Sequence, residues 1–278
     1  PPNTTPDNYT ATYSVGSSVE DANPDNNAIS FTFAVSDSTF AKETGIVSGV
    51  TPGADNAFTY GNIFHVPNGD GYFARYMSFS TTENGAIALA DSSQSVTTYL
   101  YEWNGVGGEE LSIARENLEV VAFNSYTFDG TEGSGLITIP FDLDNIAVPL
   151  KDDTYYLAAI EYAPDKEVDF FINVSRERNY QATWFLSDSL DMPRYASALD
   201  VSNTGTLGLV GFGFGVVPAI RMYIGTSDNL EEPGLSTSTQ LTLPAANKVA
   251  IFPNPVSDNL QLEIDLTANT ERLLVKVF

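Results

Sequence analysis

The chain offers few residues for a catalytic relay. It has one histidine and no cysteine in 278 residues, so His65 is the only imidazole that could act as a general base. His65 lies between Phe64 and Val66 in an alternating segment typical of a strand. Zinc catalysis would need an unusual all-carboxylate ligand set. We therefore expect a protein that is not an enzyme.

Paired carboxylates keep an enzymatic alternative open. Two acids at a suitable separation can hydrolyse glycosidic bonds. With 36 Asp and Glu residues in the chain, some suitable pair is inevitable, so the pattern has no specificity. We rank this alternative third, after an adhesive protein and a carbohydrate-binding module.

Calcium is the cofactor that the residue types favour. Oxygen donors crowd into two segments, the first with Glu20, Asp21, Asn23, Asp25 and Asn26 and the second with Asp142, Asp144, Asp152 and Asp153. Hard oxygen ligands suit this cation, and loops could wrap it. Neither segment has EF-hand spacing, so solvated acidic turns are the alternative.

Aromatic side chains could bind sugars. Tyr99, Tyr101 and Trp103 follow Thr97 on one face of a predicted strand. Exposed rings can stack on the apolar faces of sugars. Packing in the core is the alternative, because aromatic rings dominate sandwich interiors. Arg221 lies among apolar neighbours, where we expect it to pair with a carboxylate.

The charge excludes several partners. The formal net charge is −24, from 36 acidic and 12 basic residues. Such a chain repels nucleic-acid backbones and anionic lipid surfaces, so we expect no nucleic-acid partner. No apolar run is long enough to span a bilayer, so we expect no membrane insertion.

The elements that must position these residues are mostly strands. We predict them at 58–66, 72–80, 96–103, 118–128, 135–141, 154–162, 169–174, 181–186, 208–217 and 219–224. Clusters of Gly, Asn, Asp and Pro separate these segments. The pattern predicts an all-β fold, an antiparallel β-sandwich that is jelly-roll-like, over residues 45–225. Only residues 109–119 could form a short helix. In the strand expected at 208–217, Gly211, Gly213 and Gly215 should let a backbone or an aromatic ring approach closely.

Residues 1–44 contain two further strands. Tyr9 to Val15 and Ile29 to Val35 alternate apolar and polar residues around an Asx-rich loop. The pair resembles the last strands of an Ig-like or adhesion-type module. Its apolar faces need a partner, so we expect it to pack on the main domain, on upstream sequence or on a neighbouring molecule.

The C-terminal residues carry the most specific motif. Phe252, Pro253, Asn254 and Pro255 lead into the alternating segment Leu260 to Ile264. The two prolines stiffen the entry into this strand, and we expect residues 273–278 to return as its partner. Residues 248–278 resemble the start of the type A C-terminal sorting domain of the type IX secretion system of Bacteroidota. The polar stretch 226–247 reads as a linker before it.

The resemblance implies export by the type IX secretion machinery to the outer cell surface or the medium. The sorting domain of this family continues past the point where Phe278 ends the chain, and the chain begins at Pro1 without Met or leader. We therefore expect a mature or trimmed fragment.

The central region resembles a β-sandwich segment found before sorting domains in secreted Bacteroidota proteins. The matching pieces include Tyr60 to Phe64, Ile139 to Phe141, Leu150 to Leu157, a strand around Trp184, and Pro218 to Met222. This resemblance supports architecture and assigns no activity. Two tripeptides around Ser38 and Ser189 look like the O-glycosylation acceptor pattern of such proteins.

Together these features predict a secreted or cell-surface structural and adhesive protein. It could be a subunit of an extracellular assembly, with self-assembly or surface glycans as its contacts. The alternative is a carbohydrate-binding accessory module of a larger secreted enzyme.

Overall fold

The fold is seen in a computed structural model that describes residues 6–14, 27–46, 48–53, 56–83, 94–105, 111–129, 132, 135–163, 170–190, 192–230, 248–252 and 261–265. The chain divides into two compact units, Pro1–Leu235 and Ser236–Phe278. The division falls inside the segment predicted as a linker. The start of that segment is tied to the first unit, because Arg75 and Tyr76 donate hydrogen bonds to the carbonyls of Asn229 and Leu230.

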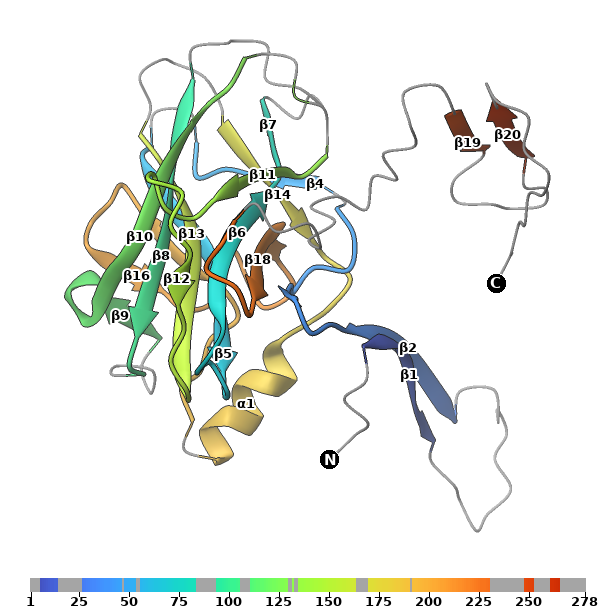
Figure 1. Cartoon of the computed structure of the whole chain (residues 1–278). Coiled ribbons are helices and arrows are strands. Elements are labelled where there is room, and N and C mark those ends of the chain that lie inside the picture. Colours follow the sequence, from blue (N-terminus) through green and yellow to red (C-terminus); the bar gives the residue numbers. More distant parts are fainter. Residues whose placement is uncertain are drawn as a thin grey trace. The chain divides into compact units, whose positions relative to one another are not determined.

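A seven-stranded antiparallel sheet forms one layer of the first unit (Figure 1). Its order is β10 (Leu118–Thr127), β8 (Ser95–Trp103), β13 (Thr154–Tyr162), β5 (Phe58–Val66), β15 (Ala198–Val201), β16 (Thr206–Gly208) and β9 (Ser112–Ala114). Eight of the nine residues of β5 are buried. Both faces of this central strand are therefore covered, even at its polar residues Thr59 and Asn62.

Two smaller antiparallel sheets form the other layer. One contains β11 (Ile137–Pro140), β6 (Phe73–Phe79), β18 (Ile220–Gly225) and β3 (Thr39–Phe40), with β12 (Val148–Pro149) beside β6. The other contains β17 (Val217–Pro218), β14 (Phe170–Ser175) and β4 (Ser48–Val50), with β7 (Thr81–Glu83) beside β14. Because β3 pairs with β18, this layer takes up residues before the expected boundary at 44.

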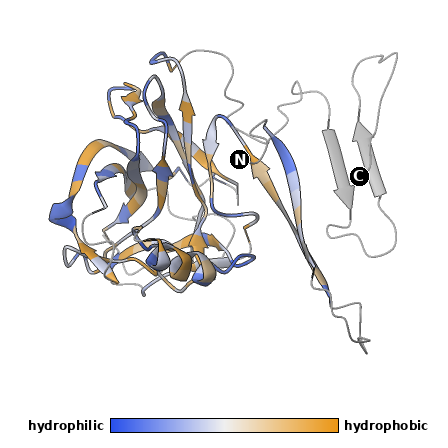
Figure 2. Ribbon diagram, turned by 90° about the horizontal axis from the view of Figure 1, so that it is seen from below, coloured by the Kyte–Doolittle hydropathy of each residue, from blue (hydrophilic) through white to orange (hydrophobic). Residues whose placement is uncertain are grey.

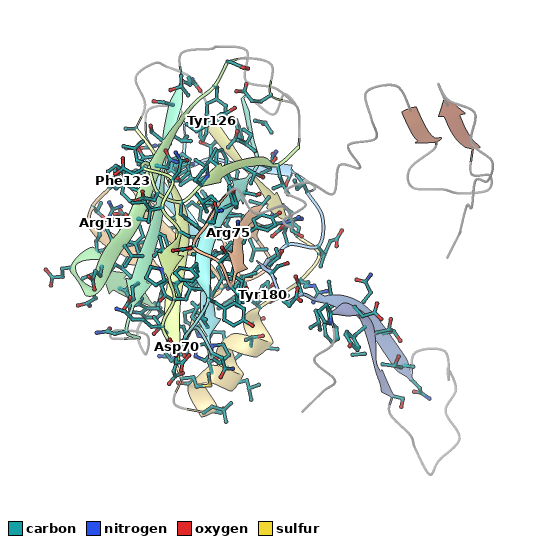
Figure 3. The ribbon with its side chains drawn as sticks, in the orientation of Figure 1. Asp70, Arg75, Arg115, Phe123, Tyr126 and Tyr180 are labelled. Atoms are coloured by element: carbon teal, nitrogen blue, oxygen red, sulfur yellow. The ribbon has the colours of Figure 1, made fainter. Side chains whose placement is uncertain are left out.

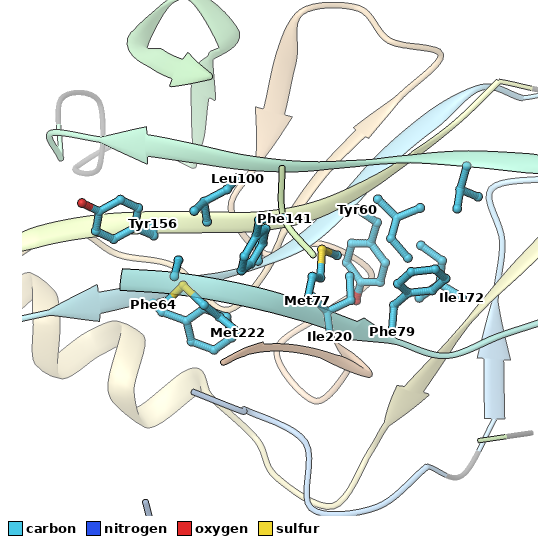
Figure 4. Packing of buried hydrophobic residues seen from close by; sticks show 14 of the residues in the cluster. Tyr60, Phe64, Met77, Phe79, Leu100, Phe141, Tyr156, Ile172, Ile220 and Met222 are labelled. Atoms are coloured by element: carbon cyan, nitrogen blue, oxygen red, sulfur yellow. The ribbon is translucent and has the colours of Figure 1, made fainter. Parts of the chain in front are cut away.

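The main core lies between the two layers (Figure 4). Tyr60 and Phe64 of the large sheet face Met77, Phe79 and Met222 of the smaller one. Burial of such rings and thioethers supplies the main stabilising free energy, about 1.5–3 kcal/mol for each large side chain. The prediction of an all-β antiparallel sandwich is confirmed.

A second apolar cluster covers the other face of the large sheet. Ile63, Tyr101, Trp103 and Leu157 pack there, together with Trp184 from helix α1 (Gln181–Ser189). The prediction of a strand at 181–186 was wrong. The segment forms a helix that is held by one buried residue, because Trp184 packs edge-on against Phe214 with ring centres 5.4 Å apart.

Helix α1 has mixed polarity, and Figure 2 shows hydrophobic and hydrophilic colours along it. It spans nine residues. Within the described ranges, no helix has the length and the apolar character that crossing a membrane requires.

Two other expectations were wrong. Residues 112–114 form β9 and residues Arg115–Asn117 a 3-10 turn, where a short helix was expected. Between β16 and β17 the chain turns instead of extending, because Gly211 and Gly213 have φ of +55° and +126°. Gly211 does let an aromatic ring approach, since a Cβ built on it would lie 3.0 Å from the Tyr60 ring.

Both predicted terminal ribbons contain paired strands. In the first unit, β1 (Asp7–Ser14) pairs antiparallel with β2 (Ala28–Val35). In the second unit, β20 (Gln261–Asp265) pairs with β19 (Lys248–Phe252). The partner of β20 thus precedes the proline motif, whereas the expected partner at 273–278 lies outside the described residues.

Candidate functional site

A row of rings crosses the large sheet where β5 and β13 meet. Tyr155 lies opposite His65 on β5 and opposite Trp103 on β8. The imidazole of His65 stacks on Tyr155 with ring centres 4.6 Å apart and planes 22° apart. Side chains directly across an antiparallel pair are close enough to form such contacts. The register therefore aligns the row.

Tyr180, which precedes α1, and the loop that follows α1 complete a small cavity. Tyr195 meets Tyr155 edge-on at 5.9 Å. The cavity, which we call the tyrosine pocket, has a volume of about 210 Å³ and is lined by Lys42, His65, Tyr155, Tyr180, Thr183, Ser187, Met192, Pro193 and Tyr195. Figure 3 shows Tyr180 beside the start of α1. Tyr155, Tyr180 and Tyr195 are each partly buried, and burial raises the pKa of all three hydroxyls.

His65 contributes a polar edge to the tyrosine pocket. Its Nε2 lies 2.8 Å from Oδ1 of Asp153, which is 88% exposed. Asp153 begins the return into β13 with a φ of +48°, a conformation that Asp tolerates better than most residues. The imidazole therefore has a fixed orientation and acts as a positioned hydrogen-bonding group.

Lys42 is the most perturbed titratable group of the site. Its Nζ donates to the carbonyl of Ala196 at 2.6 Å and lies 4.5 Å from the ring centre of Tyr195 and 5.1 Å from that of Tyr180. The Tyr180 hydroxyl donates to the Lys42 carbonyl at 2.8 Å, which holds this loop in place. Burial lowers the pKa of Lys42 to about 7.

A second cavity lies on the other side of Lys42. This basic pocket has a volume of about 450 Å³ and is lined by Asn8, Phe33, Ala34, Ser36, Thr39, Ala41, Lys42, Glu43, Thr44, Arg178, Tyr180 and Arg221. The Glu43 side chain is fully buried and forms an ion pair with Nε of Arg221. Burial raises the pKa of the Glu43 carboxyl although Arg221 opposes the shift. The expected carboxylate partner of Arg221 is thus confirmed.

A carboxylate pair does lie on the large sheet, but it is tied into a structural network. Arg115 is 2.9 Å from Glu161 and 3.6 Å from Asp200. Asp200 also accepts hydrogen bonds from the backbone of Thr204 and Gly205 at 2.8 and 2.9 Å. These contacts hold the β15–β16 turn and give both acids hydrogen-bond or ion-pair partners, with one guanidinium shared between them.

The strand face of Thr97, Tyr99, Tyr101 and Trp103 is mainly core. Tyr101 and Trp103 are buried in the second apolar cluster, and Tyr99 stacks on Tyr101 with ring centres 5.2 Å apart. Burial raises the pKa of Tyr101. Phe123 extends the row across β10 and is 48% exposed.

The structure describes only one of the two segments predicted to bind calcium. Asp21, Asn23, Asp25 and Asn26 lie outside the described residues, so that site stays a prediction. In the second segment, Asp152 accepts backbone hydrogen bonds from Gly69 and Asp70 at 2.7 and 2.9 Å, while Asp153 pairs with His65. Among the residues that the structure describes, no three His, Asp or Glu side chains are grouped to hold a metal ion.

The predicted modification and sorting residues are described in part. Ser38 is half-buried in the turn before β3, with its oxygen 3.4 Å from that of Ser36. Ser189 is exposed at the end of α1 and donates to the carbonyl of Phe185 at 3.1 Å. Phe252 ends β19, whereas Pro253, Asn254 and Pro255 lie outside the described residues.

Sequence reasoning missed Lys42, Tyr180 and Tyr195 as members of a site. They lie on loops with no regular period, and only the fold brings residue 42 to residues 180 and 195. Asn179 offered a local signal for α1, because its side-chain oxygen accepts a hydrogen bond from Gln181 N at 2.8 Å at the start of the helix.

No protein-family model matches the chain, and no curated protein matches it. The tyrosine pocket is therefore interpreted from its own geometry. Its rings, one imidazole and a few hydroxyls suit binding of a small polar ligand with an apolar face.

Proposed function

We propose that the chain is a non-enzymatic, cell-surface or secreted β-sandwich that binds glycans through the tyrosine pocket. The observation that carries the proposal is the set of three partly buried tyrosines, Tyr155, Tyr180 and Tyr195, that line one cavity. Ring faces suit the C–H faces of a sugar, and amphipathic tyrosine can bind in this way while its hydroxyl stays hydrated.

The size of the cavity favours recognition of one sugar unit. Its volume of about 210 Å³ is below the range of roughly 300–1,000 Å³ usual for drug-sized ligands. The hydroxyls of Thr183 and Ser187 and the imidazole of His65 surround it and can exchange hydrogen bonds with sugar hydroxyls. A terminal sugar of a surface glycan would fit this arrangement. Binding of such a glycan would attach the protein to a cell surface, which is a form of adhesion.

A glycan array followed by titration tests the proposal. Tyr155→Ala should weaken binding at least tenfold, because stacked rings supply much of the contact energy in such sites. Thr183→Trp should also block binding, since it places a bulky ring at an exposed helix position that lines the cavity. Phe123→Ala is the matched control, an exposed aromatic residue on the same sheet that lines neither cavity. A wild-type chain that binds no glycan contradicts the proposal.

Export by the type IX secretion system is the second part of the proposal. It is supported by the proline motif at 253–255 and by the strand β20 that follows it. Removal of residues after Ala246 from the protein made in its own organism should leave it inside the cell envelope. Unchanged export of the shortened protein contradicts this part.

Self-assembly is a second candidate function, and β1 and β2 favour it. Within the described residues these strands pair only with each other. Strand edges that lack a neighbour are templates for pairing with another chain. Sedimentation over a range of concentrations, with and without residues 1–36, tests this candidate; a monomer at every concentration counts against it.

A further inference from the structure

One amine beside the tyrosine pocket has no role in the proposed binding of glycans. Nζ of Lys42 lies 4.5 Å from the ring centre of Tyr195 and 5.1 Å from that of Tyr180. Both rings and Lys42 itself line the pocket, so the nitrogen lies in its wall. A nucleophilic atom in this position is held close to any small molecule that enters the cavity.

Lys42 lacks the partner that a buried ammonium group needs. In the part of the chain that the structure describes, its Nζ donates to the Ala196 carbonyl at 2.6 Å and forms no ion pair with a carboxylate. The adjacent acid, Glu43, pairs with Arg221 instead. Burial of an unpaired charge is costly. A neutral amine can still donate one hydrogen to Ala196, and it keeps its lone pair.

We infer that Lys42 forms an imine with small aromatic aldehydes that enter the tyrosine pocket. Tyr155, Tyr195 and Met192 line the cavity and offer apolar contacts to one aromatic ring. In the reaction, Nζ attacks the carbonyl carbon, and the two amine hydrogens leave with the carbonyl oxygen as one water molecule. The imine nitrogen, once it takes up a proton from solvent, can donate to the Ala196 carbonyl as the amine did.

The pKa of Lys42 supports this inference. Burial lowers it to about 7, so much of Lys42 is free amine at neutral pH, whereas an exposed lysine with a pKa of about 10.4 is almost entirely protonated. Only the free amine is nucleophilic. The other charged or titratable groups that line the two cavities beside Lys42 are Glu43, His65, Tyr155, Arg178, Tyr180, Tyr195 and Arg221.

Reductive trapping tests the inference on the full 278-residue chain. The protein is treated with benzaldehyde and sodium cyanoborohydride, which reduces an imine to a stable secondary amine, and peptide mass spectrometry locates the modified residues. At pH 7 we expect Lys42 to react about tenfold faster, or more, than Lys151, which is exposed and pairs with Glu102. The preference should shrink as the pH rises to 10. Lys42 is already deprotonated in that range, whereas Lys151, whose pKa is raised by its hydrogen bond to Glu102, still gains free amine.

Three variants separate the contribution of the cavity from that of the amine. Lys42→Met should lose the adduct, and its matched control Lys151→Met should leave labelling of Lys42 unchanged. Thr183→Trp places a bulky ring at an exposed position that lines the pocket. It should slow labelling of Lys42 about tenfold, because the aldehyde is no longer held beside Nζ, and should not change labelling of Lys151.

Two results would overturn the inference. The first is labelling of Lys42 that is no faster than labelling of Lys151, and the second is fast labelling of Lys42 that Thr183→Trp leaves intact. Either result leaves the proposed glycan binding standing, because that proposal does not use the Lys42 amine.

Discussion

The ammonium nitrogen of Lys42 lies 4.5 Å from the centre of the Tyr195 ring. This contact places a cation among rings that also bury it. Cation–π attraction offsets part of the desolvation cost, but the remaining cost lowers the pKa of Lys42 to about 7. The wall between the two cavities is therefore less stable when Lys42 is charged.

Lys42→Met should stabilise the protein at low pH. Below pH 7 Lys42 is charged in both the folded and the unfolded state, so the full cost of burial applies. Between pH 7 and about 10.5 the unfolded chain binds a proton that the folded one does not, so wild-type stability rises with pH. We expect the Met variant to gain up to about 5 kcal/mol at pH 6, the equivalent of lowering the pKa from 10.5 to about 7, and little advantage near pH 10.

Urea unfolding at both pH values measures this difference. Lys151→Met is the control, because Lys151 is exposed and pairs with Glu102 at the surface. An advantage of Lys42→Met that is the same at both pH values would show that Lys42 carries no buried charge.

Glu43→Ala should destabilise the sandwich by about 3–5 kcal/mol, because it leaves Arg221 without its buried partner. The double change Glu43→Leu with Arg221→Met should cost much less, since both charges are removed together. Thermal unfolding of the single and double variants measures the coupling. A double variant as unstable as Glu43→Ala would contradict a role for the ion pair and would point to packing alone.

The positions of the strands were predictable from the sequence where burial of one or both faces fixes the order of apolar and polar residues. β13 has a long apolar run from Tyr155 to Ile160 because both of its faces are covered, whereas β5 shows an apolar alternation at Phe64 to Val66. Helix α1 was not predictable from period, because Ala182, Trp184 and Leu186 alternate as in a strand. Only Trp184 of these is buried, so tertiary contact with Phe214 and local hydrogen bonding decide the conformation.

The site could be predicted only in part. Tyr155 and His65 belong to recognisable strands, and their register follows from strand pairing. Lys42 and Tyr195 lie in loops, and the contact between them depends on how β3 and α1 are placed around the sheet. No local pattern encodes a contact between residues 153 positions apart, so the cavities emerge only with the fold.

Gly61→Ala should destabilise the large sheet by about 1–3 kcal/mol. A Cβ at this position would lie 2.4 Å from the carbonyl oxygen of Ala158 and 2.7 Å from the Cβ of Ala159, and neither atom belongs to a flexible side chain. Gly135→Ala is the control, because nothing lies within 4 Å of its built Cβ. Equal stability of the two variants in thermal unfolding would mean that β5 and β13 are more widely spaced.

Asn179→Ala should loosen α1 and, with it, one wall of the tyrosine pocket. The Asn179 side-chain oxygen accepts a hydrogen bond from Gln181 N at 2.8 Å in an Asx turn just before the helix, and loss of one such hydrogen bond costs about 0.5–1.5 kcal/mol. Asn179→Asp keeps the acceptor and adds a negative charge near the helix N-terminus, so it should preserve stability. Hydrogen exchange of residues 182–189 measures the effect, with faster exchange expected only in the Ala variant. Unchanged exchange in that variant would mean that packing of Trp184 alone holds the helix.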